Sequence, residues 1–428
     1  MKYSEVIDEL KNMVYKWDNI QRVCDYIILA AVIWDSSDIH IEPLSSYVRL
    51  RYRLDWELRE ILEYQNFLHS WIVARFKIMS DLKIDESRVP QDWRISTTIE
   101  WKSLDLRVST LPTVHWEKVV MRIVDKSKQI PKLTELWIEW KNLRLIQKAI
   151  AQPNWVILTS WPTWSGKSTT LYSALTDLNK IDVNIMTLED PVENQVDGIN
   201  QSQVKPDIGY TFAYWLRTAL RQDPDIIMVW EMRDKETVDI AIEASLTWHL
   251  VLSTIHTNNS AETITRILNM WVQPFLIPAS VNIIIAQRLI KKLCPHCKKP
   301  LDLKTLWKDT IDNIKNAINI TDKAELLERV WAEKLKVPIF YGPVWCDKCD
   351  NLGYKWRLWI YEVLDITPWV KEMILAWSSA FNINIQAIKD WMVSLEQDWI
   401  IKALNWLTSL EEITKCLKIN KINIFLKL

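Results

Sequence analysis

The stretch 160–170 places the strongest constraint on how this chain folds. Its residues Ser165-Gly166-Lys167-Ser168-Thr169 form the second half of the phosphate-binding pattern G-x-x-x-x-G-K-[ST]. The apolar run 155–159 before it reads as a short strand, and 168–178 reads as a helix. A strand that runs into such a loop and then into a helix is the context that the pattern requires. The stretch therefore predicts a nucleotide site, and the alternative is a chance Ser-Gly-Lys-Ser-Thr before an ordinary helix.

Two tryptophans interrupt this pattern. Trp161 stands where the pattern has glycine, and Trp164 occupies a second position that is usually small. The loop curls so that successive backbone N–H groups point at the phosphates, which needs residues that tolerate φ > 0 and a close approach of the backbone. Tryptophan meets neither requirement. Either the stretch is not a nucleotide site, or these two letters do not represent the residues of the functional protein.

The composition favours the second explanation. The 428 residues include 26 Trp and only 5 Gly, and the two together make up about 7% of the chain, the usual share of glycine alone. Asp-Gly and Asn-Gly are standard turn pairs, whereas Asp-Trp and Asn-Trp have no comparable turn chemistry. Six of the tryptophans follow Asp or Asn, namely Asp55-Trp56, Asp92-Trp93, Asn154-Trp155, Asp390-Trp391, Asp398-Trp399 and Asn405-Trp406.

We therefore hypothesise that most of these tryptophans are glycine in the cell. The codon UGA is read as tryptophan in one variant genetic code and as glycine in certain uncultivated bacterial lineages, so the wrong table would make this replacement wholesale. Glycines from ordinary codons, such as Gly166, would survive it. The alternative is a genuinely tryptophan-rich protein, and UGG codons at positions 161 and 164 would refute the hypothesis.

The bulk composition is that of an ordinary globular chain of two or three domains. The net charge is −1, which gives no general attraction to nucleic acid or to anionic membranes. No uninterrupted apolar run approaches about 20 residues, so we expect no membrane span. Residues 1–5 open a charged amphipathic pattern and do not resemble a signal peptide. These features predict a cytoplasmic protein.

The first part of the chain predicts a small α+β domain. Residues 1–34 carry apolar residues at helical spacing, and alternation of polar and apolar residues then predicts strands. The predicted strands are 38–43, 48–54, 106–110 and 118–123. We place this domain at 1–125 and a polar, proline-containing linker at 126–140.

From residue 141 the pattern changes to alternating strands and helices, which predicts an α/β domain with a parallel-rich sheet covered on both faces. The predicted strands are 155–159, 183–188, 226–229 and 250–254, and the helices between them are 168–178, 213–221, 235–246 and 260–270. Within this domain, 291–356 carries the cysteine pairs around a charged insert, and 357–428 reads as a small helical bundle.

The phosphate-binding chemistry of the loop follows from its residue types, provided that position 161 is glycine. Lys167 would reach the β- and γ-phosphates, the hydroxyl of Ser168 would take a Mg²⁺ position, and the helix N-terminus would add its dipole. The predicted phosphate-binding residues are Trp161, Pro162, Thr163, Trp164, Ser165, Gly166, Lys167, Ser168 and Thr169.

Carboxylates follow two of the predicted strands, at the edge where such a site needs them. Glu231 comes after the run 226–229 and is our predicted general base. The alternative is that many buried strands end in an acid for no catalytic reason. Glu189, Asp190 and Glu193 follow another strand and predict Mg²⁺ or water coordination, with a solvated acidic turn as the alternative.

His249 directly precedes the predicted strand 250–254, and His256 follows the strand after one intervening residue, Ile255. A histidine at a strand end beside phosphates can hydrogen-bond the γ-phosphate, and we predict this role for both. Taken singly, either one reads more simply as a structural histidine with satisfied hydrogen bonds.

Four of the six cysteines form two C-x-x-C pairs, Cys294 with Cys297 and Cys346 with Cys349. Four thiolates are the tetrahedral ligand set that zinc prefers, and a full set leaves no open position for catalysis. The pairs therefore predict a structural zinc, with the segment between them looped out. A redox-active C-x-x-C is the alternative.

At this point the motifs resemble those of a known family, the hexameric ATPases of type II secretion and type IV pilus assembly, over nearly the whole chain. The resemblance is carried by 37–43, by 88–94, by 187–193 (similar to the family's Asp box), by 220–234 (similar to its Walker B region), by 247–258 (similar to its His box), and by 286–289 with 293–295, which resemble the entry to its zinc subdomain.

The resemblance implies a RecA-like P-loop ATPase core that uses ATP and Mg²⁺, with a mobile N-terminal domain that closes over the nucleotide. It implies arginine fingers, which we carry onto Arg107 and Arg122; ordinary surface ion pairing is the alternative. It also implies a homo-hexamer on the inner face of the cytoplasmic membrane, working with an inner-membrane platform protein. The cysteine set favours an assembly or secretion motor over a retraction motor.

The departures from the family are almost all Trp where the family has Gly, and this supports the recoding hypothesis. Residues 1–34 are too short for the extra N-terminal domain by which larger members dock on the platform, so the mode of recruitment is open. A RecA-like nucleic-acid motor is a rival function, but no basic stripe with interleaved aromatic residues supports it. A catalytically dead scaffold is the third possibility if the tryptophans are genuine.

Overall fold

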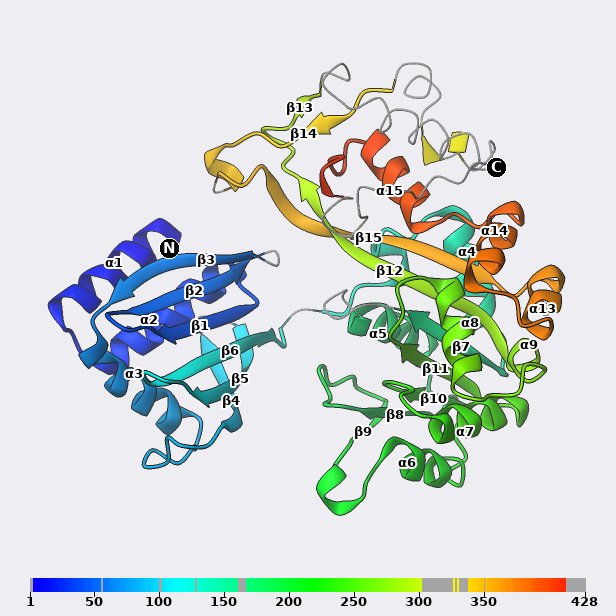
Figure 1. Cartoon of the computed structure of the whole chain (residues 1–428), viewed down its shortest axis with the longest axis horizontal. Helices are drawn as coiled ribbons and strands as arrows, with labels where there is room; N and C mark the ends of the chain where they lie inside the picture. Colours follow the sequence, from blue (N-terminus) through cyan, green and yellow to red (C-terminus); the bar gives the residue numbers. More distant parts are fainter. Residues whose placement is uncertain are drawn as a thin grey trace. The chain divides into compact units, whose positions relative to one another are not determined.

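The computed structural model divides into two compact units, Met1–Gln129 and Ile130–Leu428. It describes residues 3–54, 57–99, 102–127, 129–160, 167–301, 326–327, 329–330, 338–349 and 351–412. The division between the units falls within the predicted linker 126–140 (Figure 1).

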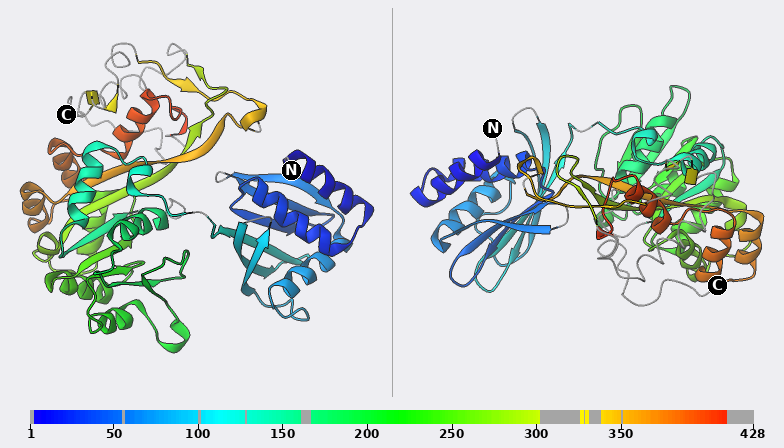
Figure 2. Two further views of the ribbon diagram at one scale, coloured as in Figure 1. Left: turned by 180° about the vertical axis from the view of Figure 1, so that it is seen from behind. Right: turned by 90° about the horizontal axis from the view of Figure 1, so that it is seen from above.

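The first unit is a two-layer α/β structure with a six-stranded antiparallel sheet in the order β3-β2-β1-β6-β5-β4. Its elements are α1 Tyr3–Lys16, α2 Ile20–Ile33, β1 Asp38–Pro43, β2 Val48–Leu54, β3 Glu57–Tyr64, α3 Asn66–Met79, β4 Gln91–Ile99, β5 Lys102–Pro112 and β6 Glu117–Asp125. The helices lie on one face of the sheet (Figure 2). The four predicted strands are β1, β2, β5 and β6; the sequence analysis did not predict β3, α3 or β4.

Alternation along β2 shows how the sequence builds these two layers. Residues at every second position are buried, among them Leu50 and Tyr52, and the hydroxyl of Tyr52 donates to the carbonyl of Ile27 in α2 at 2.7 Å. The positions between them are the arginines at 49, 51 and 53, which lie on the opposite face. One face of the sheet is therefore apolar and covered by helices, and the other is charged.

The second unit is built on a seven-stranded sheet in the order β15-β12-β7-β11-β10-β8-β9, in which only β15 is antiparallel to its neighbour. Its strands are β7 Trp155–Ser160, β8 Ile185–Glu189, β9 Asn200–Gln203, β10 Ile226–Val229, β11 Leu250–Ile255, β12 Val281–Leu293 and β15 Tyr354–Asp365, with a small separate pair β13 Lys299–Pro300 and β14 Tyr341–Gly342. This parallel-rich α/β sheet confirms the predicted fold class.

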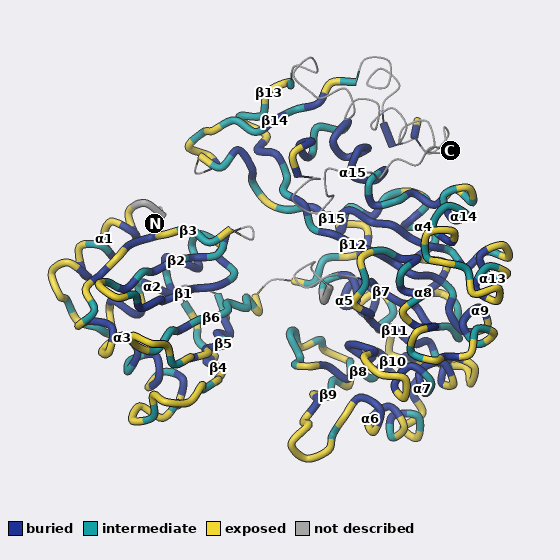
Figure 3. The backbone as a smooth tube through the Cα atoms, in the orientation of Figure 1, coloured by how far each residue is buried: buried dark blue, intermediate teal, exposed yellow. Residues whose placement is uncertain are grey.

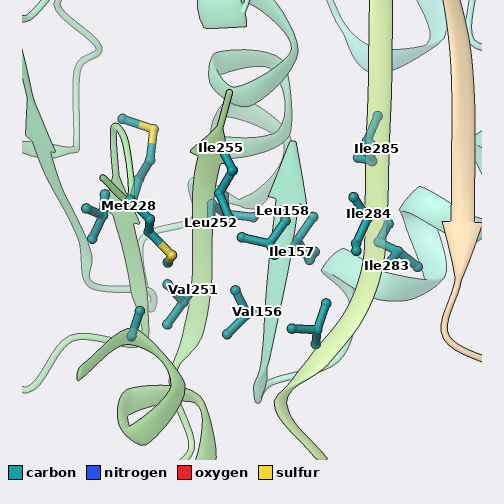
Figure 4. Packing of buried hydrophobic residues seen from close by; sticks show 14 of the residues in the cluster. Val156, Ile157, Leu158, Met228, Val251, Leu252, Ile255, Ile283, Ile284 and Ile285 are labelled. Atoms are coloured by element: carbon teal, nitrogen blue, oxygen red, sulfur yellow. The ribbon is translucent and has the colours of Figure 1, made fainter. Parts of the chain in front are cut away.

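Helices surround this sheet. They are η1 Leu133–Glu135, α4 Trp140–Ile150, α5 Lys167–Leu178, η2 Pro206–Ile208, α6 Phe212–Ala219, α7 Lys235–Leu246, α8 Ser260–Asn269, α9 Ile277–Ser280, η4 Asp347–Cys349, α13 Pro368–Leu375, α14 Ala380–Lys389 and α15 Leu395–Leu404. Every residue of β10 and β11 is buried, as expected for parallel strands covered on both faces (Figure 3). Figure 4 shows the aliphatic side chains of β7, β11 and β12 packed against each other, with Met228 of β10.

Two long strands differ from the sequence prediction. Residues 357–428 were predicted as a helical bundle, but 354–365 form β15, which pairs along β12 in an antiparallel ribbon. The strand β12 was not predicted at all. It has 13 residues, which is long for a strand, and a long apolar run cannot be told from a buried helix by its periodicity.

The backbone is left-handed at an unusual set of residues. Thirteen described residues other than glycine have a positive φ: three aspartates, one asparagine and nine tryptophans. The tryptophans are Trp17, Trp137, Trp140, Trp248, Trp271, Trp356, Trp377, Trp391 and Trp406. Asn and Asp enter this region readily, whereas a bulky side chain there is a genuine outlier. These positions have the conformation that glycine favours.

Candidate active site and metal centre

In the sequence, the predicted phosphate-binding loop connects β7 to α5. The strand ends at Ser160 and the helix begins at Lys167, so the strand–loop–helix context of the motif is present. The loop residues Trp161, Pro162, Thr163, Trp164, Ser165 and Gly166 lie outside the described residues, and for Lys167 and Ser168 only the backbone is described. Thr169, in the first turn of α5, is half-buried.

Parallel strands bring several of the predicted site residues to one edge of the sheet. Because β7, β11, β10 and β8 are parallel neighbours, their carboxyl ends meet at the edge where β7 enters the loop. Glu231 follows β10 by two residues, Glu189 ends β8, and His256 directly follows β11. The sequence therefore assembles this edge from three segments that lie far apart along the chain.

Glu231 lies at the centre of a cluster of charged and polar side chains. Only 8% of the residue is exposed, His256 Nε2 lies 3.1 Å from its Oε1, and Arg233 Nε donates to its Oε2 at 2.8 Å. Burial alone would raise the pKa of Glu231, but the contacts from His256 and Arg233 outweigh it and lower that pKa to about 2. The carboxylate is therefore held ionised by its two partners.

Arg233 is a site residue that the sequence analysis did not assign. Besides its bond to Glu231, its Nη2 lies 3.9 Å from Oδ2 of Asp190, the residue that follows β8. One signal in the sequence could have found it. A residue two positions after Glu231 in extended backbone points to the same side as Glu231.

The three predicted acidic ligands have different surroundings. The carboxylate of Glu189 is fully buried and accepts hydrogen bonds from the Tyr172 hydroxyl, from Thr187 Oγ1 at 2.8 Å and from Gln201 Nε2 at 2.9 Å. Burial raises the pKa of Glu189 above its ordinary value. Glu189 thus joins α5, β8 and β9 from within, whereas the side chain of Asp190 is 41% exposed beside Arg233.

Glu193 is half-buried four residues beyond the end of β8. Its negative charge contributes to the raised pKa of Glu189. Asp190 is in contact with the Glu231 cluster through Arg233.

The two histidines lie at opposite edges of the sheet. His256 follows the carboxyl end of β11 and contacts Glu231. His249 precedes the amino end of the same strand, and its Nδ1 lies 2.9 Å from the carbonyl oxygen of Ala244 in α7. Within one chain, His249 is therefore separated from the predicted phosphate site by the whole length of β11, because a strand places its two ends on opposite edges. His256 alone joins the cluster.

The two predicted arginine fingers are neighbours on the charged face of the first unit. Arg107 of β5 lies directly opposite Arg122 of β6, and Arg94 of β4 lies opposite Arg107, so the three occupy one face. Arg122 Nε donates to Oδ1 of the buried Asp38 at 3.1 Å.

The four cysteines form one cluster at the end of the β12–β15 ribbon. All four sulfurs lie within 4.8 Å of one another, and the pair distances are 3.9 Å for Cys294–Cys346, 3.7 Å for Cys297–Cys349 and 3.6 Å for Cys346–Cys349. A tetrahedral zinc with Zn–S bonds of about 2.3 Å separates its sulfurs by roughly 3.8 Å, so the cluster fits this ion. All the cysteines of the described residues are free thiols.

Gly353 fixes the loop behind this cluster. Its N–H donates to Cys349 Sγ at 3.2 Å, its φ is +74°, and an added Cβ would lie 2.6 Å from Cβ of Pro343. Burial alone would raise the pKa of the Cys349 thiol, but this N–H bond counteracts it and that pKa is lowered. At Cys349 the local structure therefore favours the thiolate that a metal needs, whereas burial raises the pKa of the Cys297 thiol to about 12.

Comparison with known proteins gives a consistent result. The family described as "Type II/IV secretion system protein" matches residues 15–415. The chain is 43% identical over 400 residues to the type IV pilus assembly ATPase PilB of Pseudomonas aeruginosa, covering 93% of this chain and 68% of that protein. It is 42% identical over 386 residues to the type II secretion system ATPase E of Vibrio cholerae, covering 90% of this chain and 72% of that protein.

Two solved structures show the same fold at lower identity. The ATPase DotB of Legionella pneumophila has a TM-score of 0.64 at 19% identity, with 91% of this chain and 94% of that chain covered. The pilus retraction motor PilT with bound ADP has a TM-score of 0.59 at 22% identity, with 93% and 97% covered.

Proposed function

Because the chain belongs to the family of type II secretion and type IV pilus assembly ATPases, we propose that it is a motor that hydrolyses ATP to drive pilus assembly or protein secretion. The observation that carries the site assignment is the Glu231 cluster. A buried carboxylate stands at the carboxyl edge of β10, in contact with His256, on the same edge at which β7 enters the phosphate-binding motif.

The proposed reaction is in-line attack of water on the γ-phosphate, with Glu231 accepting the proton of that water. Lys167 would lie against the β- and γ-phosphates, and His256 would hydrogen-bond the γ-phosphate beside Glu231. ATP supplies the phosphoryl group, and Ser168 would hold a Mg²⁺ ion, which would supply positive charge to neutralise the phosphates. Of Glu189 and Asp190, Asp190 is the better candidate for a role at the reacting groups, because the carboxylate of Glu189 is engaged by three hydrogen-bond donors.

This proposal requires glycine at positions 161 and 164. The backbone of a phosphate-binding loop must approach the phosphates closely, and an indole side chain would fill that space. The proposed ATPase activity therefore depends on the recoding hypothesis. A comparison of ATP binding between the tryptophan and glycine forms of the protein tests this dependence.

We also propose that Cys294, Cys297, Cys346 and Cys349 hold a structural zinc. The sulfur spacing supports the proposal, and four ligands close the coordination sphere.

We further propose a homo-hexamer that works at the cytoplasmic face of the inner membrane with a platform protein, and we keep Arg107 and Arg122 as its arginine fingers. The family and its named pilus and secretion members support this assignment. Among the described residues, no helix is long and apolar enough to cross a membrane. For pilus assembly, we expect pilin and platform genes alone beside this gene. For secretion, we expect such genes together with a gene for an outer-membrane secretin.

The test compares ATP binding and turnover in full-length protein made with glycine at the UGA positions. We expect Glu231→Gln to lower turnover at least about 100-fold while ATP affinity stays unchanged, because only the proton acceptor is lost. Glu236→Gln is the matched control, since Glu236 is an exposed acid in an ion pair with Arg217. Unchanged turnover in Glu231→Gln would refute the assignment. Protein with the literal tryptophans should bind no ATP.

A further inference from the structure

The carboxylate of Glu231 has a partner on each oxygen, and the two partners come from different segments. His256 approaches Oε1 from the end of β11, and Arg233 donates to Oε2 from the segment after β10. The Glu231 side chain is 10% exposed, whereas that of Arg233 is 59% exposed. The guanidinium of Arg233 therefore extends inward from the surface and pairs with the buried carboxylate of Glu231.

Arg233 also joins two strand ends. While its Nε bonds Glu231, its Nη2 lies 3.9 Å from Oδ2 of Asp190, which follows the neighbouring parallel strand β8. At that distance the second contact is an ion pair without a direct hydrogen bond. The planar, permanently charged guanidinium suits this bridging role, since it presents several donors in a fixed plane.

We propose that Arg233 is a positioning residue for hydrolysis, which holds the carboxylate of Glu231 in place and ties it to the acidic turn after β8. This proposal rests on the proposed function, because it assumes that Glu231 accepts the proton of the attacking water. Without Arg233, Glu231 keeps one partner and can rotate about its own side-chain torsions. A displacement of about 1 Å at a reacting group lowers a rate by roughly 100-fold.

The test measures kcat and the affinity for a non-hydrolysable ATP analogue separately, in glycine-restored full-length protein. We expect Arg233→Gln to lower kcat about 10- to 100-fold with analogue affinity within about twofold of the parent. Arg233→Lys should recover part of kcat, because an ammonium keeps one contact to Glu231 but cannot bridge to Asp190. Arg217→Gln, an exposed arginine paired with Glu236, is the matched control and should leave kcat unchanged.

The outcomes separate this proposal from the proposed function. If Glu231→Gln is inactive and Arg233→Gln has parental kcat, only the Arg233 proposal fails. If Arg233→Gln instead loses analogue affinity at unchanged kcat, Arg233 is a nucleotide ligand and the positioning role is wrong. If Glu231→Gln keeps its turnover, the assignment of Glu231 as proton acceptor fails and the Arg233 proposal fails with it. If the glycine-restored parent does not hydrolyse ATP, the proposed function itself fails. A thermal melt of each variant identifies misfolding. Full recovery of kcat in a folded Arg233→Lys variant overturns the bridging argument, because lysine keeps a contact to Glu231 without the bridge to Asp190.

A second inference rests on a different observation, the backbone at the ends of the helices. Six of the nine left-handed tryptophans directly follow an α-helix or its last capping residue, at the ends of α1, α7, α8, α13, α14 and α15. At five of them the next residue closes the helix end with an N–H to a carbonyl five residues earlier: Asp18 to Met13 at 3.0 Å, His249 to Ala244 at 3.3 Å, Ser378 to Met373 at 2.9 Å, Met392 to Ala387 at 2.8 Å, and Leu407 to Lys402 at 3.0 Å.

This bond pattern and the left-handed residue inside it define the Schellman helix end, at which glycine is strongly preferred. From the backbone we infer that all nine left-handed tryptophan positions are glycine in the functional protein. The composition indicates only that most tryptophans are glycine, whereas the backbone identifies nine of the positions. The backbone evidence does not depend on the family or on the phosphate-binding motif.

Tandem mass spectrometry of the protein from its native cells tests this inference directly. Peptides that contain positions 377 and 391 should carry glycine, and a tryptophan at either would overturn the inference for that position. In a recombinant host, the gene translated with UGA as glycine should give folded protein. Poorer folding of that protein than of protein with tryptophan at all nine positions would contradict the assignment.

Discussion

Replacing three exposed tryptophans by glycine should make this protein more stable, against the usual effect of adding glycine. The positions are Trp248, Trp271 and Trp377, which follow α7, α8 and α13 with φ values of 71°, 64° and 54°. Their exposed fractions are 73%, 79% and 60%, so truncation removes little buried apolar surface. A residue with a Cβ loses about 1 kcal/mol in this conformation, and the three replacements together should add about 3 kcal/mol to the free energy of unfolding.

The control makes the same chemical change where the backbone is helical. Trp71 lies within α3 and is 65% exposed, and Trp71→Gly should lower the free energy of unfolding by about 0.5 kcal/mol because glycine is the poorer helix former. Urea unfolding of the full-length protein measures both effects through the midpoint at unchanged slope. A triple variant no more stable than its parent would refute the reasoning, and so would stabilisation by Trp71→Gly.

Three further predictions concern the second unit. Cys297→Ser should abolish stoichiometric zinc in the purified protein, as measured by metal analysis, and full retention would contradict the four-thiolate site. Gly353→Ala should weaken zinc binding even though no ligand changes, because its Cβ would meet Pro343 at 2.6 Å; unchanged zinc affinity would show that the loop adapts. Asp398→Asn should destabilise the protein by about 3–5 kcal/mol by removing the buried charge that pairs with Lys402 and Arg329, and urea midpoints near the parental value would contradict this.

The same carboxylate gives a prediction about acid. Burial alone would raise the pKa of Asp398, but Lys402 and Arg329 lower it. A group whose pKa is lower in the folded state contributes stability above its unfolded pKa, and that contribution disappears as the pH falls through the folded value. The parent should therefore lose more stability than Asp398→Asn between pH 5 and acid, as urea midpoints across that range would show.

The parts of the fold that the sequence predicted well are those in which one local pattern has a single structural solution. The parallel strands β7, β10 and β11 are short, apolar and bounded by helical patterns, and parallel pairing then brings Glu231 and His256 to one edge. By contrast, the sequence pattern does not predict β15, because this strand follows the second cysteine pair closely and contains two tryptophans, Trp356 and Trp359, whose identity is in question. The pairing partner of a strand is not encoded in its own periodicity.

Within the site, the sequence located elements better than side chains. It placed both histidines beside β11 and gave them the same role, but the structure shows that His256 contacts Glu231 whereas His249 contacts Ala244 of α7 at the other end of the strand. It gave Glu189 a metal-binding role from its place in an acidic turn, yet the three donors to that carboxylate come from segments that no local pattern connects. Roles that depend on long-range partners require the tertiary structure.

The tryptophans connect the evidence from the sequence with the evidence from the backbone structure. A random scatter of tryptophan would not coincide with left-handed backbone, because that conformation is set by helix ends and turns and not by the identity of the residue. Nine such coincidences would together oppose folding by about 9–18 kcal/mol, as much as the whole stability of a typical domain. A free-energy cost of this size would cancel the stability of the fold, and glycine at the nine positions removes the cost. The same replacement restores the loop at 161 and 164, so one change of codon meaning accounts for both the backbone and the nucleotide site.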